Sequence, residues 1–76
     1  MYKRTQLMEY ITQDNIAFLV EDLKIDISRA MRLFYTSEVY KKLLDEETGL
    51  YLESSAYVYD LFKSEHENGK LLQNEI

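Results

Sequence analysis

The residues that could carry out acid–base or nucleophilic chemistry are few in this chain. Cysteine is absent, and the single histidine, His66, lies in a polar stretch near the C-terminal end. Without cysteine, the chain can form no disulfide, no thiolate nucleophile and no cysteine-based zinc site. A metal site would need carboxylates alone, and the sequence has no loop with the alternating acids and central glycine that bind calcium.

The carboxylates occur as neighbours, in Glu21-Asp22 and in Asp45-Glu46-Glu47. Adjacent residues of a helix point about 100° apart, so such neighbours diverge when their segment is helical. General acid–base catalysis needs a positioned carboxyl with a shifted pKa, usually in an apolar cleft. The pattern therefore favours solvent-exposed acidic faces over a pair of catalytic acids.

The hydroxyl residues lie where helices need caps, at Thr36-Ser37 and Ser54-Ser55. None of them can be paired with His66 and an orienting acid, and no glycine-rich loop for phosphates is present. We therefore expect a protein that is not an enzyme, with no catalytic, cofactor-binding or metal-binding residues and no cofactor.

The elements that position these residues begin with a long helix over residues 3–24. Ile16, Leu19, Val20 and Leu23 repeat at the spacing that places side chains on one helical face. Asp14-Asn15 form helices weakly, so the sequence leaves open a continuous helix or a break there.

Two short helices follow. The first is expected over residues 27–35, capped by Asp26 or by Ser28, with an apolar face turned inward. The second is expected over residues 38–44, capped by Ser37. The inward face of the first comprises Ile27, Ala30, Met31 and Phe34.

Gly49 is the expected positive-φ residue of a turn, and residues 50–52 read as extended. Ser54 or Ser55 then caps a last helix that ends near Ser64. The fold class predicted is all-α, a small bundle of about four helices with one short extended segment near 49–52. Residues 1–64 would form the single domain, and residues 65–76 a flexible tail.

The net charge of the chain indicates which classes of partner it can bind. The formal net charge is −5, and no apolar run approaches the roughly 20 residues of a membrane span. Nucleic acid attracts basic surfaces, so we expect it not to be the partner. The alternative is a DNA-associated regulator of helix-turn-helix type, built from helices 27–35 and 38–44. It would need Arg29, Arg32, Lys41 and Lys42 on one face.

Seven tyrosines are more than a chain of this size can bury. Tyrosine offers a large contact area and a polar tip, which suits interfaces. We expect Tyr40, Tyr51 and Tyr57 to lie partly in the core. Residues expected at a partner interface are Tyr35, Tyr40, Tyr51 and Tyr59.

Residues 7–63 resemble a family of short uncharacterised bacterial proteins. The resemblance rests on Phe18–Tyr35, on the Val39–Leu43 segment and above all on Glu47-Thr-Gly-Leu-Tyr51. The proline that usually follows the second serine of the family is replaced here by Ala56. Related families are often encoded beside toxin-like enzymes, which implies an accessory or antitoxin role. Because no apolar run follows the basic residues at the start, as it would in a signal peptide, we expect a bacterial cytoplasmic location.

The function expected from the sequence is accordingly a non-enzymatic protein–protein interaction module, which could also form a weak homodimer. A purely structural or assembly subunit is a third possibility beside the DNA-associated regulator.

Overall fold

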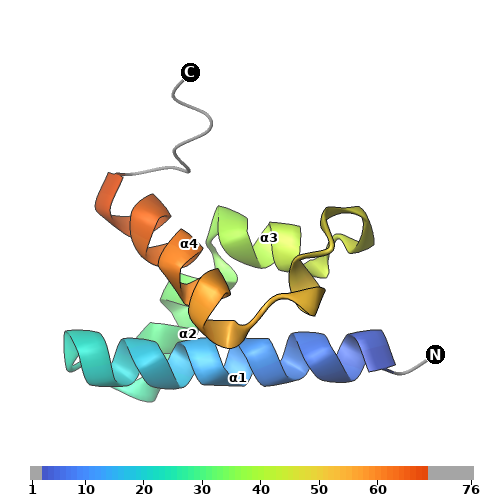
Figure 1. Ribbon diagram of the computed structural model, residues 1–76. Coiled ribbons are helices and arrows are strands. Elements are labelled where there is room, and N and C mark those ends of the chain that lie inside the picture. The colour runs from blue at the N-terminus through green and yellow to red at the C-terminus, as the bar shows by residue number, and fades with distance from the viewer. Residues whose placement is uncertain (1–2, 69–76) are drawn as a thin grey trace.

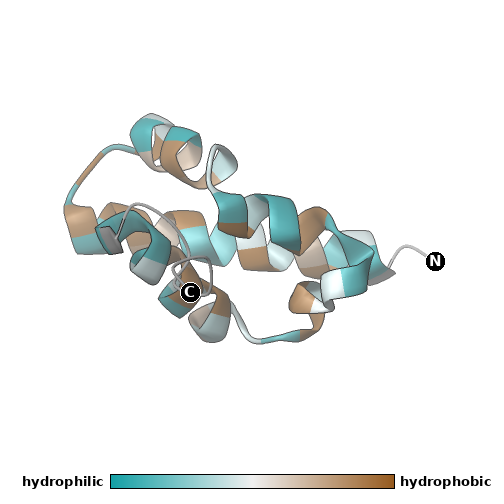
Figure 2. Cartoon of the chain, turned by 90° about the horizontal axis from the view of Figure 1, so that it is seen from above, coloured by the Kyte–Doolittle hydropathy of each residue, from teal (hydrophilic) through white to brown (hydrophobic). Residues whose placement is uncertain are grey.

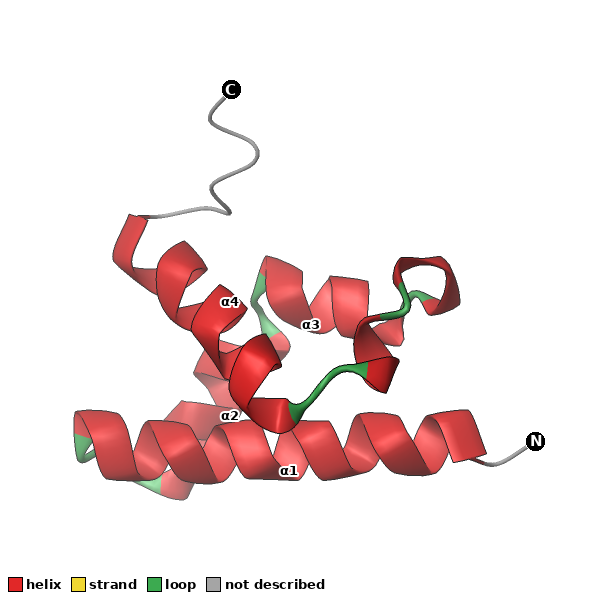
Figure 3. Ribbon diagram, in the orientation of Figure 1, coloured by secondary structure: helices red, strands yellow, loops and turns green. Residues whose placement is uncertain are grey.

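The computed structural model describes residues 3–68, and every regular element in that range is helical (Figures 1 and 3). The predicted all-α bundle of four helices is confirmed. The elements in order are α1 (Lys3–Leu23), α2 (Ile27–Tyr35), α3 (Glu38–Leu44), the 3-10 turns η1 (Glu46–Thr48) and η2 (Leu50–Leu52), and α4 (Ser55–Asn68).

Helix α1 is the base of the molecule, and it runs unbroken through Asp14 and Asn15 (Figure 1). Asn15 is fully buried, and its amide donates to the Ile11 carbonyl at 2.9 Å and to the Ser55 carbonyl at 3.3 Å. The second bond joins α1 to the start of α4. A residue that forms helices weakly is thus kept in the helix by its contacts within the bundle.

The starts of α2 and α3 are as predicted. The Asp26 carboxylate accepts from the Arg29 amide at 2.8 Å, and the Ser37 hydroxyl accepts from the Tyr40 amide at 3.1 Å. These caps satisfy amides that the first helical turn leaves without partners.

Two of the four residues expected on the inward face of α2 are exposed, so that prediction is wrong for them. Ala30 and Phe34 are fully buried, but Ile27 is 62% exposed and Met31 37% exposed. The molecule measures 35 × 33 × 18 Å, and a helix with its side chains is about 10–12 Å wide. The bundle is therefore too thin to cover both flanks of a short helix.

The expected extended segment at 49–52 is wrong. Gly49 does have the positive φ that was predicted, at +68°, but residues 50–52 form the 3-10 turn η2. The amides of Leu52 and Glu53 donate to the carbonyls of Gly49 and Leu50, both at 3.0 Å. A 3-10 turn satisfies these groups locally, whereas an isolated strand has no partner for them.

Helix α4 begins after Ser54, whose hydroxyl accepts from the Tyr57 amide at 3.1 Å. It continues past the expected end at Ser64 to Asn68, so residues 65–68 are helical and the predicted tail does not begin at 65. The rest of that predicted tail, residues 69–76, lies outside the described residues.

The core lies between α1 and the elements that pack against it, α2, α3, α4 and η2. Hydrophobic and hydrophilic bands alternate along the helices, as expected for elements that bury one side only (Figure 2). The buried apolar residues are Ile11, Ile16, Leu19, Ala30, Phe34, Val39, Leu43, Leu50, Val58 and Phe62.

Candidate protein-binding groove

Helix α2 exposes an apolar stripe. Ile27, Met31 and Tyr35 are spaced four residues apart, so they lie on one side of the helix, beside the buried side that carries Ala30 and Phe34. The three side chains are between 37% and 62% exposed. A run of exposed apolar side chains on one helix is characteristic of contact surfaces.

The stripe borders a hollow of about 340 Å³ between α1 and α2. On α1, Gln13, Ile16 and Ala17 line it, and the stripe itself lines the other side. None of these residues is charged, although 30% of the whole chain is.

A second hollow, of about 400 Å³, continues from the first along α1 toward its N-terminal end. Gln13 and Tyr35 line both hollows, which therefore adjoin, and we call the two together the apolar groove. In this part its lining includes one charged residue, Glu9. The residues of the second hollow are Thr5, Met8, Glu9, Thr12, Gln13, Tyr35, Tyr40 and Leu44.

Aromatic contacts connect the apolar groove to the core. The Tyr35 and Tyr40 rings lie 5.0 Å apart, and Tyr40 contacts the buried Phe34 edge-on at 5.6 Å. A tyrosine held by neighbouring rings has few free rotamers, so it loses little side-chain entropy when a partner binds. Met8 and Met31 add flexible side chains that adapt to different apolar shapes.

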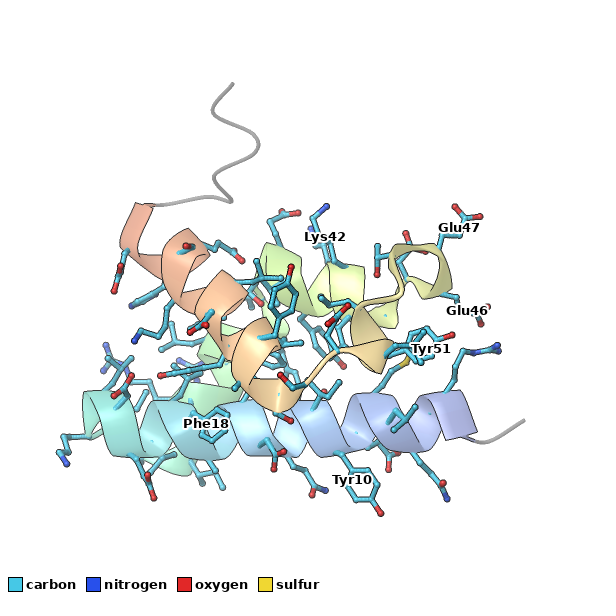
Figure 4. All side chains as sticks on the ribbon, viewed as in Figure 1. Tyr10, Phe18, Lys42, Glu46, Glu47 and Tyr51 are labelled. Atoms are coloured by element: carbon cyan, nitrogen blue, oxygen red, sulfur yellow. The ribbon has the colours of Figure 1, made fainter. Side chains whose placement is uncertain are left out.

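The structure brings together two of the four tyrosines predicted at an interface. Tyr35 and Tyr40 line the apolar groove. Tyr51 instead lies half-buried on η2, above the N-terminal half of α1 (Figure 4). Tyr59 lies on α4, where its ring packs against Phe18 at 5.1 Å.

Tyr59 belongs to a separate hollow, of about 630 Å³, between α1 and α4. Its hydroxyl donates to the Asp22 carboxylate at 2.7 Å. Burial raises the pKa of the Tyr59 hydroxyl, and the hydrogen bond and charge of Asp22 raise it further. We call this hollow the acidic hollow, since Glu21, Asp22 and Asp60 line it with a single Lys24.

The tyrosines expected partly in the core behave differently from one another. Tyr40 and Tyr51 are half-buried and pack against the core, as predicted. Tyr57 is 48% exposed, so that expectation is wrong. It points outward because the neighbouring Val58 takes the buried position of α4.

The remaining chemical groups have structural partners. The Ser37 hydroxyl donates to the Phe34 carbonyl at 2.6 Å, and Ser55 donates to the Asp14 carboxylate at 2.6 Å. His66 stacks on Phe62 with ring centroids 5.7 Å apart. Over residues 3–68, no three His, Asp or Glu side chains are grouped closely enough to hold a metal ion.

The basic residues that a DNA-binding surface would need lie beside acidic residues. Arg29 and Arg32 border a shallow hollow that includes Asp26. Lys41 lies 3.6 Å from the Glu38 carboxylate, one turn earlier on α3. The two arginines and Lys41 therefore lie near acidic side chains, which weaken the positive electrostatic potential that a phosphate backbone would meet.

Sequence reasoning missed Ile27 and Met31 as surface residues. Their spacing of four with Tyr35 is the signal that marks a second apolar side on α2. It was hidden because Ile27, Ala30, Met31 and Phe34 also follow the ordinary spacing of a single buried face.

No family model, curated protein or solved structure matches this chain. None of the helices within residues 3–68 is long and apolar enough to span a membrane.

Proposed function

We propose that this chain is a non-enzymatic protein–protein interaction module and that its binding surface is the apolar groove. The observation that carries this proposal is the uncharged hollow between α1 and α2, bordered by Ile27, Met31 and Tyr35. Transferring such apolar surface out of water is the main driving force of most protein associations.

The shape of the groove suits an extended apolar contact. It passes from Ile27 on α2 to Leu44 on α3, along one side of α1. An amphipathic helix places apolar side chains in such grooves at intervals of three or four residues. Tyr35 and Tyr40, in the middle, are of the residue type that contributes most to binding energies.

The resemblance to families encoded beside toxin-like enzymes supports a more specific form of this proposal. A basic enzyme would approach the acidic chain quickly, because opposite net charges accelerate encounter. The groove would then supply the apolar contacts that hold the complex. Neutralisation of such an enzyme is the role that we propose for the module.

The experiment compares two variants in which lysine replaces an exposed aliphatic residue. In Ile27→Lys, a charge enters the groove at a side chain that is 62% exposed. In Leu52→Lys, the same charge enters η2, outside the groove, at a side chain that is 69% exposed. Tagged full-length chains are used to capture partners from the native cell, and mass spectrometry identifies what each variant retains.

We expect the partner to be retained by wild type and by Leu52→Lys and to be lost by Ile27→Lys. With the purified partner, the affinity of Ile27→Lys should fall by more than about tenfold, which corresponds to about 1.4 kcal/mol. Equal binding by all three chains would contradict the groove as the binding surface. Circular dichroism of each variant checks that the helices are intact.

A further inference from the structure

We propose that Asn15 is a positioning residue that fixes how α4 sits on α1, and that the chain keeps it at a cost in stability. Asn15 lies within α1 with none of its surface exposed. Its contact with the Ser55 carbonyl, at 3.3 Å, joins residues 40 positions apart in the chain. Asn15 is not among the residues that line the apolar groove, so this role is independent of the proposed binding surface.

The orientation of the Asn15 amide leaves its oxygen without a partner. The carbonyl oxygens of Ile11 and Ser55 can only accept, so the Nδ2 group must point toward them. The Oδ1 atom is then buried, and within residues 3–68 it accepts no hydrogen bond. A buried polar atom without a partner destabilises a fold, and asparagine forms helices weakly. An apolar side chain of similar volume, such as leucine, would remove both effects.

The two carbonyls do not need Asn15 as a donor. Both lie within helices, where the amide four residues further on also donates to each of them. Replacing Asn15 by leucine would therefore leave neither carbonyl without a partner. The Ser55 hydroxyl also donates to Asp14, at 2.6 Å, but this pair is exposed, so water competes for it. The buried contact of Asn15 is therefore the one that gives the start of α4 a fixed direction.

The apolar side of α4 is too broad to fix the position of the helix by itself. Five large apolar or aromatic residues lie within two turns, and they are Tyr57, Val58, Tyr59, Leu61 and Phe62. Val58 and Phe62 are buried, but a helix turned about its axis would bury other members of this group. Apolar burial has no direction, whereas a hydrogen bond requires a particular distance and angle.

The position of α4 decides whether two later contacts can form. The Tyr59 hydroxyl donates to Asp22 at 2.7 Å, and Glu65 accepts from the Val39 amide at 3.1 Å. Sliding α4 by one turn would move these groups by about 5.4 Å, which is more than a hydrogen bond tolerates. Because Asn15 holds the first residue of α4, it fixes where these side chains lie.

The test replaces Asn15 by leucine and uses Thr12→Val as the matched control. Thr12 is also a buried polar residue of α1, but its hydroxyl donates to the Met8 carbonyl of the same helix, at 2.7 Å. The denaturant midpoint of Asn15→Leu should equal or exceed that of the wild-type chain, because the buried oxygen is gone. A midpoint clearly below that of wild type, or a variant that does not fold, would overturn the proposal.

The Val39 amide reports the position of α4 from a different helix. It donates to Glu65, so its hydrogen exchange is slow only while α4 keeps its place. In Asn15→Leu this exchange should accelerate by more than about tenfold, and the amide resonances of α4 should broaden or double. In Thr12→Val both should remain as in wild type. Unchanged exchange at Val39 in Asn15→Leu, or an equal acceleration in Thr12→Val, would overturn the positioning role.

Discussion

Phe34 lies at the centre of the bundle, with none of its surface exposed. Its ring is 5.6 Å from the ring of Tyr40 on α3 and 5.7 Å from that of Phe62 on α4. One side chain of α2 therefore holds two other helices in place.

Truncating this side chain should be close to the limit that the domain tolerates. Phe34→Ala should lower the free energy of unfolding by about 3–5 kcal/mol, and Leu19→Ala, 1% exposed, by about 2–5 kcal/mol. Small domains have total stabilities of about 5 kcal/mol or slightly more. Thermal unfolding measures the loss, with Ile27→Ala as an exposed control. Unchanged midpoints for Phe34→Ala and Leu19→Ala would show that the core is misassigned.

Tyr59 links stability to alkaline pH. Burial and the Asp22 carboxylate raise the pKa of its hydroxyl in the folded chain above the ordinary value near 10. The unfolded chain therefore loses this proton first as the pH rises. Its contribution to stability is complete below pH 10 and is lost above it, as the pH rises toward the folded pKa.

Tyr59→Phe should make unfolding less dependent on pH above 10. Denaturant titrations at pH 9, 10 and 11 would measure this, with Tyr10→Phe, a variant of the 64% exposed Tyr10, as the matched control. The same slope for wild type and Tyr59→Phe would contradict a raised pKa at this hydroxyl.

At the scale of elements, α3 depends on a carboxylate from α4. Glu65 accepts from the amides of Glu38 at 2.9 Å and Val39 at 3.1 Å, and so satisfies the first turn of α3. The contact joins residues 26 and 27 positions apart in the chain. It also explains why α4 continues beyond Ser64.

Glu65→Gln should destabilise the fold by about 1–2 kcal/mol, because only one oxygen, now neutral, remains to accept, and the NH2 group in place of the other oxygen cannot accept from a backbone amide. Glu67→Gln changes the same charge on an exposed part of α4 and serves as the control. Chemical denaturation of both variants gives the comparison, and an equal effect would show that charge alone matters.

The residue that follows helix α1 has an unfavourable backbone conformation. Lys24 has φ of +56°, a region that residues other than glycine adopt at a cost of about 1–2 kcal/mol. Lys24→Gly should therefore stabilise the chain by about 0.5–1 kcal/mol, after allowing for the greater freedom of glycine when unfolded. Gly49→Ala, at φ of +68°, should do the opposite. A lower unfolding midpoint for Lys24→Gly would mean that its side chain contributes more than its backbone conformation costs.

At the scale of the whole molecule, net charge acts on stability. The chain has fourteen acidic residues and nine basic ones. Its ion pairs, such as Arg4 with Glu46 at 2.8 Å, are largely exposed to solvent. Exposed pairs contribute about 1 kcal/mol or less each. Repulsion among the carboxylates should therefore outweigh them at low salt.

Raising the ionic strength from about 0.01 M to about 0.3 M should increase the unfolding temperature at neutral pH, because it shortens the screening length from about 30 Å to under 8 Å. The same change near pH 4.7, the isoelectric point, should have a smaller effect. A fall in the unfolding temperature with salt at neutral pH would show that the ion pairs dominate.

The sequence by itself determined the helical class, the helix starts at Asp26 and Ser37, and the turn at Gly49. These features depend on contacts within a few residues, so residue type and spacing are enough to predict them. The caps and the positive φ need no distant partner.

Only the tertiary structure decided the rest. It turned residues 50–52 into a 3-10 turn, kept Asn15 within α1, and extended α4 by the contact of Glu65 with α3. It also separated the four predicted interface tyrosines, so that Tyr35 and Tyr40 alone line the groove. Each outcome depends on which helix packs against which flank, and a periodic pattern marks an apolar side without saying what covers it.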